Sequence, residues 1–227
     1  MSTPPEPTFQ APRIPEHRPG RPGGKRDVNR QARLDALCRS ALALMLERGV
    51  DSVTVDEIAR HAGLSKAGFY RYFNGPTELM TTALAPMATA VDELAARIVA
   101  ALEAALDTEG LTLAYQQLAA GLLAIILHHP EGTRLYLQER FGPPSPMRAP
   151  ILDLARRVLA IVTRMTRASR AHGLMRDVDV DMTARVVSGA AHEVLGWYLR
   201  GELPIDPAGA VEVLIDVTMW GVRERPP

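Results

Sequence analysis

The chain has 227 residues, and its 26 basic and 26 acidic side chains give a formal net charge of zero. A composition of 47% hydrophobic and 23% charged residues is ordinary for a globular protein and excludes a wholly disordered chain. One cysteine, Cys38, excludes an internal disulfide framework and fits a reducing cytoplasm. The longest uninterrupted apolar runs, such as 122–127, are far shorter than the ~20 residues of a membrane span, and no secretory signal is present. We therefore expect a cytoplasmic protein without a membrane partner.

The charges are distributed unevenly along the chain. Residues 1–33 carry seven basic and three acidic side chains, whereas residues 86–227 carry an acidic excess. Residues 1–22 also hold seven of the eighteen prolines and show no apolar periodicity. These features predict a disordered, basic, proline-rich arm over residues 1–27. Such an arm is either a solvated tail or an electrostatic contact with nucleic acid.

Beyond the arm, apolar residues recur at helical spacing. No alternating apolar run or hairpin signal competes, so the expected fold class is all-α with about nine helices. Pro86 should kink the long fourth helix or split it in two, because proline removes a backbone hydrogen bond. The expected helices span about 29–48, 54–62, 65–73, 76–105, 111–129, 131–140, 151–172, 179–200 and 207–224.

The second and third helices carry recognisable start signals. Thr54 and Glu57 have the spacing of a capping box, and Ser65 is a good N-cap for the next helix. Only Gly63-Leu64 separates the two helices, which is the spacing of a helix-turn-helix. A short helix with small residues near its start fits the major groove of DNA. The alternative is a compact three-helix packing unit whose tyrosines lie at a protein interface.

Residues 46–80, LERGVDSVTVDEIARHAGLSKAGFYRYFNGPTELM, resemble the N-terminal DNA-binding domain of the tetracycline-repressor (TetR) family. The resemblance implies a helix-turn-helix domain over residues 28–75 and an effector-binding and dimerisation domain over residues 76–227. It also implies a homodimer formed through the last two helices, which binds a double-stranded DNA operator. The matching positions are Gly49, Thr54, Ile58, Ala59, Ala62, Gly63, Ser65, Tyr70, Phe73, Glu78 and Leu79.

The same resemblance assigns roles to individual residues. Thr54 and Tyr72 would contact phosphates, and the start of the third helix would enter the groove. The family often has histidine where Tyr72 stands and usually has lysine where Pro76 stands, so one phosphate contact per subunit should be missing. The candidate DNA-binding residues are Thr54, Ser65, Lys66, Ala67, Gly68, Tyr70, Arg71 and Tyr72.

The basic arm is a candidate replacement for that missing contact. Its Gly20-Arg21-Pro22 is similar to the core of an AT-hook, in which an extended arginine enters a narrow minor groove. A solvated linker remains the alternative. The arm residues that would contact DNA are Arg18, Arg21, Lys25 and Arg26.

The C-terminal part should hold a small hydrophobic or amphipathic effector between the helices of residues 76–175. Candidate lining residues are Met87, Tyr115 and Met165, although each also fits an ordinary core position. We expect no other cofactor.

Catalytic and metal-binding patterns find little support in this part of the chain. His192-Glu193 begins like a zinc-protease helix, but Gly196 stands where the second histidine is needed. Adjacent His128 and His129 point to different sides of a helix, so they make a poor metal pair. We expect no catalytic residue and no metal site.

These observations predict a ligand-responsive DNA-binding transcriptional regulator, specifically a repressor that a small effector releases from a palindromic operator. The competing hypothesis is a helical interaction or scaffold protein whose helix-turn-helix is vestigial. An enzyme built on the C-terminal bundle is a third, weaker reading.

Overall fold

A computed structural model describes residues 24–105, 107–173, 175, 177–202, 204, 206, 209–210, 212–214 and 217. These residues contain eight α-helices, a short 3-10 helix (η1) and no strand, which confirms the all-α prediction. Of the last expected helix, the described residues 209–210, 212–214 and 217 are helical, and the rest lies outside the described part of the chain. In chain order the elements are α1 (Lys25–Arg48), η1 (Val50–Ser52), α2 (Val55–His61), α3 (Lys66–Phe69), α4 (Pro76–Ala104), α5 (Thr108–His128), α6 (Pro130–Glu139), α7 (Ala149–Ala171) and α8 (Val180–Arg200).

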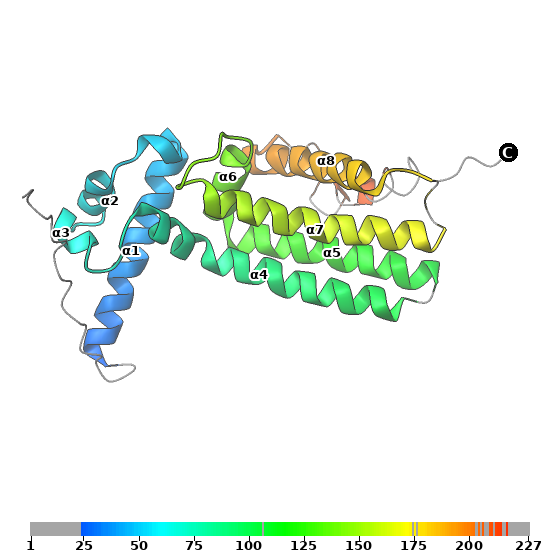
Figure 1. The fold of residues 1–227 in the computed structure, drawn as a ribbon, viewed down its shortest axis with the longest axis horizontal. Helices are drawn as coiled ribbons and strands as arrows, with labels where there is room; N and C mark the ends of the chain where they lie inside the picture. Colours follow the sequence, from blue (N-terminus) through cyan, green and yellow to red (C-terminus); the bar gives the residue numbers. More distant parts are fainter. Residues whose placement is uncertain are drawn as a thin grey trace, which may run out of the picture.

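The helices form a small head and an elongated bundle (Figure 1). In the head, α1 packs against α2, and α2 packs against α3. Helix α4 begins beside α1 and runs along the bundle, where it packs against α5 and α7, while α8 lies on α7. Short α6 contacts α1 in the head as well as α4, α5, α7 and α8. Two helices, α4 and α6, therefore connect the head to the bundle.

The start of α2 is fixed by the capping box that the sequence predicts. The Thr54 hydroxyl accepts the Glu57 N–H, and the Glu57 carboxylate accepts the Thr54 N–H at 2.9 Å. Ser65 caps α3 by accepting the Gly68 N–H at 3.1 Å. Between these helices the chain reverses at Gly63, whose φ of +71° favours glycine. Local chemistry alone is thus sufficient to place α2 and α3.

Two expected boundaries are wrong. Helix α1 begins at Lys25 rather than near residue 29, with Gly24 as its N-cap and Asp27 in its first turn. A carboxylate there is favourable because the helix N-terminus carries partial positive charge. Helix α3 ends at Phe69, and the chain continues as turns through Tyr72 instead of as a regular helix to residue 73.

Of the kink or split expected at Pro86, the split does not occur, because α4 remains one continuous helix through that residue. Pro86 is exposed and follows buried Leu84, while Met87 on the next position is buried again. The carbonyl that proline leaves unpaired belongs to exposed Thr82, where water can satisfy it. The proline therefore lies on the solvent side and leaves the packed face intact.

The head has a small core of its own. Its central side chains come from α1, α2 and α3 and the turn that follows, and each is at most 3% exposed. Cys38 lies beside them, half-buried, and burial raises the pKa of its thiol to about 11. The thiol is therefore protonated at neutral pH. The central side chains are Leu37, Ala41, Met45, Ile58, Phe69 and Phe73.

Helix α5 is more apolar overall than the short uninterrupted apolar runs in its sequence indicate. By length and composition, residues 109–128 could cross a membrane, with a mean hydropathy of 1.6. A core helix of a bundle meets the same criterion, and α5 packs against α4 and α6. Its small Gly121 lies where an added Cβ would meet Leu94 of α4 at 2.3 Å. Helices α4 and α5 therefore approach each other closely at this point.

Candidate DNA-binding surface and effector cavity

Helix α3 presents a polar and basic surface at the tip of the head. Lys66, Ala67 and Arg71 are exposed, and Tyr70 is 41% exposed with its ring edge-on to buried Phe69. Neither Lys66 nor Arg71 forms an ion pair with any described residue. Both cations are therefore free to contact phosphates or base edges.

Two of the expected contact residues are less accessible. Gly68 is buried, because it faces Leu64, whose Cβ lies 3.4 Å from the position of an added Cβ. Gly68 was among the expected DNA-binding residues, but it is not exposed on this surface. Tyr72 is half-buried against the core, and the guanidinium of Arg71 lies 5.9 Å from the centre of its ring.

Thr54 is exposed, but its hydroxyl is already engaged. It donates to the Glu57 carboxylate at 2.7 Å, and the same carboxylate pairs with Arg48 at 2.7 Å. Hydrogen bonds from the Thr54 backbone and hydroxyl, together with Arg48, hold the pKa of Glu57 down at about 2. This carboxylate is therefore ionised at neutral pH, and it orients Thr54 at the start of α2.

The start of α4 is held by hydrogen bonds to Glu78 that the sequence analysis missed, although its N-cap, Gly75, makes no side-chain cap hydrogen bond. Pro76 is the first residue of the helix, and Glu78 accepts hydrogen bonds from the Asn74 backbone N–H at 2.7 Å and from the Asn74 side chain at 2.8 Å.

The arm residues divide into two groups. Arg18 and Arg21 lie outside the described residues, whereas Lys25 and Arg26 are exposed in the first turn of α1. The expectation that all four belong to an extended arm is therefore wrong for Lys25 and Arg26. Because the α1 backbone fixes the Cα positions of Lys25 and Arg26, these side chains can reach fewer DNA positions than side chains on a flexible extended chain could.

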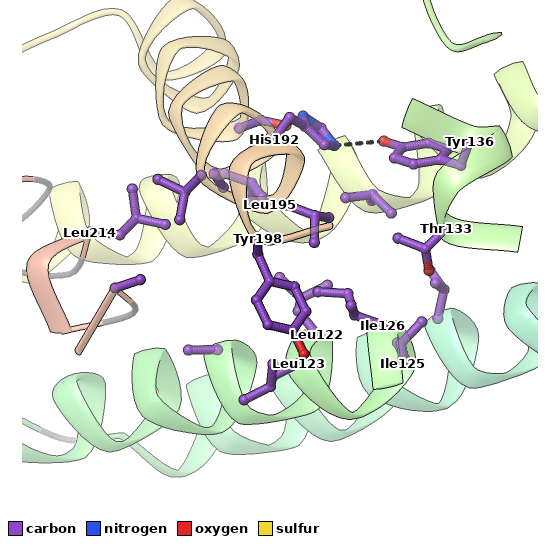
Figure 2. A pocket seen from close by; sticks show the side chains of 18 of the residues that line it. Leu122, Leu123, Ile125, Ile126, Thr133, Tyr136, His192, Leu195, Tyr198 and Leu214 are labelled. Carbon is purple, nitrogen blue, oxygen red and sulfur yellow. Dashed lines mark hydrogen bonds between the residues drawn. The ribbon is translucent and has the colours of Figure 1, made fainter. Parts of the chain in front are cut away.

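The bundle contains an apolar cavity of about 170 Å³ between α4, α5, α6, α7 and α8 (Figure 2). Ala210 and Leu214, which follow α8, also contribute to its wall. No Asp, Glu, Lys or Arg side chain is among its described lining residues, and its few polar atoms belong to Thr133, Tyr136, Ser188, His192 and Tyr198. The cavity is therefore an uncharged site for an apolar molecule.

Only one of the three expected lining residues reaches this cavity. Met87 lines it, whereas Tyr115 and Met165 line an adjoining cavity of about 80 Å³ that shares part of the wall. The Tyr115 hydroxyl pairs with Ser169 at 2.8 Å, and burial raises the pKa of Tyr115.

A hydrogen-bonded pair that the sequence analysis missed lies at the cavity wall. The Tyr136 hydroxyl on α6 is 2.8 Å from Nε2 of His192 on α8, and Ser188 lies 3.4 Å from the other ring nitrogen (Figure 2). Burial lowers the pKa of His192 to about 4 and raises the pKa of Tyr136 to about 12, so both are neutral near pH 7. A lone histidine on a mostly apolar helix was the available signal, but its partner is 56 residues away.

Comparison with known proteins places these two regions in one family. The family described as "Bacterial regulatory proteins, tetR family" matches residues 37–81, and the one described as "Tetracyclin repressor-like, C-terminal domain" matches residues 114–209. Together they cover more than half of the chain. The chain belongs to the TetR family.

Similar proteins agree with this assignment. The HTH-type transcriptional activator FasR of Mycolicibacterium smegmatis is 29% identical over 221 residues, which cover 93% of each chain. The HTH-type transcriptional regulator BetI of Rhizobium meliloti is 26% identical over 202 residues, or 86% of this chain and 88% of BetI. The structure of the regulator FadR from Bacillus subtilis in complex with stearoyl-CoA shares the fold, with a TM-score of 0.59 and 14% identity over 83% of this chain and 99% of FadR.

The predicted function is thereby confirmed at the level of a DNA-binding transcriptional regulator. Membership of the TetR family favours this function over the helical scaffold protein. The surface on α3 coincides with the matched DNA-binding region, and the cavity lies in the matched C-terminal region. No group of three or more His, Cys, Asp or Glu side chains that could hold a metal ion occurs among the described residues.

In this TetR-family chain, a buried ion pair of the C-terminal bundle also contacts the head. Glu139 at the end of α6 accepts two hydrogen bonds from Arg148, at 2.7 and 3.1 Å, and a third from the backbone N–H of Val50 at 3.3 Å. Arg148 also reaches Asp51 of η1 at 2.8 Å. These bonds raise the pKa of Arg148, with Glu139 as the main cause. Helix α6 therefore contacts the head through Glu139 at its C-terminal end and lines the cavity with Thr133 and Tyr136.

The outer face of α8 carries several exposed apolar side chains, with exposed Arg185 and Glu193 among them. Met182 and Val186 are 62% and 64% exposed, and Trp197 further along the helix is 42% exposed. Val213 and Val217, beyond α8, are 54% and 63% exposed. Exposed apolar side chains gathered on one face are typical of a protein interface.

Proposed function

We propose that this protein is a homodimeric repressor that a small hydrophobic or amphipathic effector releases from a palindromic DNA operator in the cytoplasm. The observation that carries the proposal is the continuity between the uncharged cavity and the DNA-reading head. Met87 and Val91 of α4 line the cavity, and the same helix begins at Pro76, directly after the helix-turn-helix. An effector that repacks the cavity therefore acts directly on the helix that positions the head.

The mechanism follows from the rigidity of these connections. An effector that binds better when α4 and α6 are displaced shifts the population toward that arrangement. In a dimer this changes the separation of the two α3 helices, which must match about one turn of DNA, ~34–36 Å, or a multiple of it. Operator affinity falls when the separation no longer matches.

The dimer supports operator binding, because a two-fold protein matches a two-fold DNA site. We assign the dimer interface to α8 and the segment that follows it. Their exposed Met182, Val186, Trp197, Val213 and Val217 would be buried by the second subunit. Small Gly189 on the same helix has open space where a Cβ would be, which permits close approach of the partner helix.

Affinity selection from random DNA duplexes tests the proposal. The wild-type chain should enrich a palindromic sequence, whereas the double variant Lys66→Ala/Tyr70→Phe should enrich none while keeping its helicity and its dimeric mass. The matched control is Arg164→Ala, an exposed cation of the bundle, which should select the same palindrome. Failure of the wild-type chain to enrich any palindrome would contradict DNA reading by this head.

The sign of regulation needs a separate measurement, since the relative FasR is named an activator. Placing the selected operator over a reporter promoter distinguishes the two cases. Repression is supported if deleting the gene for this protein raises reporter expression, and activation is indicated if the deletion lowers it.

The arm makes a smaller and non-specific contribution in this proposal. Deleting residues 2–23 should weaken DNA binding and reduce its dependence on salt, because fewer phosphates are neutralised. Lys25→Ala/Arg26→Ala tests the two cations on α1 separately. Unchanged affinity and unchanged salt dependence in both variants would show that the arm is a solvated tail.

A further inference from the structure

Thr133 has a buried hydroxyl with no partner. The residue is 1% exposed, lines the cavity, and its Oγ1 forms no hydrogen bond with any described residue. A buried hydroxyl without a hydrogen bond is unfavourable, because it loses its interaction with water and gains nothing in return. Such a group in a native cavity wall indicates an interaction that is completed by something absent from the chain itself.

Other threonines in the bundle helices donate a hydrogen bond to their own helix, and Thr133 does not. The hydroxyls of Thr163 and Thr166 on α7 donate to the carbonyl four residues earlier, each at 2.9 Å. For Thr133 the residue four positions earlier is His129, whose φ of −130° and ψ of 55° place it outside the helix. The His129 carbonyl accepts the Thr133 backbone N–H at 2.9 Å, but the Thr133 hydroxyl makes no hydrogen bond to it or to any other described residue.

The Tyr136–His192 pair provides a second hydrogen-bonding group near Thr133, and this group can act as either donor or acceptor. Tyr136 lies one turn after Thr133 on α6, so the two side chains share a helix face (Figure 2). If the Tyr136 hydroxyl donates to His192, its oxygen can accept a further hydrogen bond; if His192 donates, the hydroxyl proton is free. The pair can thus serve a donor or an acceptor, whereas no charged side chain lines the described wall.

We propose that the effector is a neutral, largely apolar molecule that places one hydroxyl or carbonyl oxygen against Thr133 and the Tyr136–His192 pair. This inference rests on the proposed effector-binding function and narrows its ligand class. A carboxylate is disfavoured because burying an ionised group without a cation is strongly unfavourable. A neighbouring cation, Arg140, is not part of the described wall: its guanidinium stacks on the Phe141 ring at 3.9 Å. Its Nε also has no hydrogen-bond partner among the described residues, and its charge helps to lower the pKa of His192.

The size of the cavity gives suitable probes. An apolar cavity of about 150 Å³ holds benzene, so a volume of about 170 Å³ fits a substituted six-membered ring. Cyclohexanol and methylcyclohexane have nearly the same shape and differ by a hydroxyl in place of a methyl group. Cyclohexanone supplies an acceptor only, and cyclohexanecarboxylate supplies a negative charge.

The test compares the dissociation constants of these probes in the wild-type full-length chain and in Thr133→Val, measured by NMR titration at pH 7. Valine keeps the shape of the side chain and removes the hydroxyl. The preference for cyclohexanol over methylcyclohexane should fall by about threefold to tenfold in the variant, which corresponds to one hydrogen bond. Thr163→Val, which removes an internally bonded hydroxyl outside the cavity wall, should leave the preference unchanged.

Three results would overturn the inference: an unchanged preference in Thr133→Val, tighter binding of cyclohexanecarboxylate than of cyclohexanol, or no binding of any probe. Melting temperature gives an independent check on the ligand-free protein, since Thr133→Val should be at least as stable as wild type when the orphan hydroxyl is removed. A lower melting temperature would show that the hydroxyl has an internal role. Operator selection uses DNA and not these probes, so it separates failure of this inference from failure of the proposed regulator.

Discussion

The helix-turn-helix head and the cavity of the bundle are stabilised in different ways. In the head, the polar groups that shape α2 and α3 bond within three residues, as Thr54 does with Glu57 and Ser65 with Gly68. At the cavity, Tyr136 meets His192 across 56 residues, and at the adjoining cavity Tyr115 meets Ser169 across 54. The head is therefore encoded locally, whereas the cavity exists only when distant helices are packed together.

The largest expected effect concerns the buried ion pair of the bundle that also contacts the head. Glu139→Ala leaves Arg148 buried with only part of its charge compensated, which should reduce the free energy of unfolding by about 3–5 kcal/mol. Urea denaturation measures the change. Asp92→Ala is the matched control, since it removes an exposed pair with Arg157 and should change stability by less than about 1 kcal/mol. Equal effects of the two variants would contradict a buried connection between head and bundle.

A methyl group at the close contact of α4 and α5 should have the next largest effect. Gly121→Ala places a Cβ against fully buried Leu94, so overpacking should destabilise the bundle by about 1–3 kcal/mol. Leu94→Ala opens space at the same point, so the double variant should be more stable than the sum of the two single effects predicts. Strict additivity in thermal unfolding would show that the two positions do not meet.

A smaller effect is expected in the head from the loss of one cap. Thr54→Ala removes the hydroxyl that accepts the Glu57 N–H and should reduce stability by about 1 kcal/mol. Thr54→Ser keeps the hydroxyl and should retain most of the stability. Urea denaturation of the two variants is the measurement, and an equal loss in both would assign the effect to the threonine methyl group instead of the cap.

The cavity and the head should lose stability in different pH ranges as the solution is acidified. The pKa of His192 is about 4 in the folded protein against an ordinary 6.5, so its stabilising contribution is complete above pH 6.5 and is lost as pH falls toward 4. The pKa of Glu57 is about 2 against 4.5, so its contribution is lost only as pH falls from 4.5 toward 2. His192→Phe should flatten the pH dependence of stability between 6.5 and 4, and Glu57→Gln should flatten it below 4.5. The prediction is contradicted if His192→Phe alters the pH dependence only below pH 4.5, or if Glu57→Gln alters it only between pH 6.5 and 4.5.

Much of the head could be predicted because its signals are adjacent in sequence. The capping box at Thr54, the cap at Ser65 and the reversal at Gly63 all occur where local chemistry placed them. The burial of Gly68 was not predictable in the same way, since it depends on how the turn packs Leu64 against α3. The DNA contacts of the individual residues remain predictions.

The cavity was predicted only in outline. Met87 was identified, but Tyr115 and Met165 line a neighbouring cavity, and Thr133, Tyr136 and His192 were not singled out as lining residues. No local pattern distinguishes a threonine that bonds to its own helix from one that does not.

The sequence by itself determined the helical architecture, the helix-turn-helix and the family resemblance, because helix caps, glycine turns and apolar periodicity act over a few residues. Only the tertiary structure decided that Pro86 leaves α4 unbroken, that α6 connects cavity and head, and that an uncharged cavity contains an unpaired hydroxyl. Burial and pairing are properties of neighbours in space. For this protein those neighbours are often more than fifty residues apart in the chain.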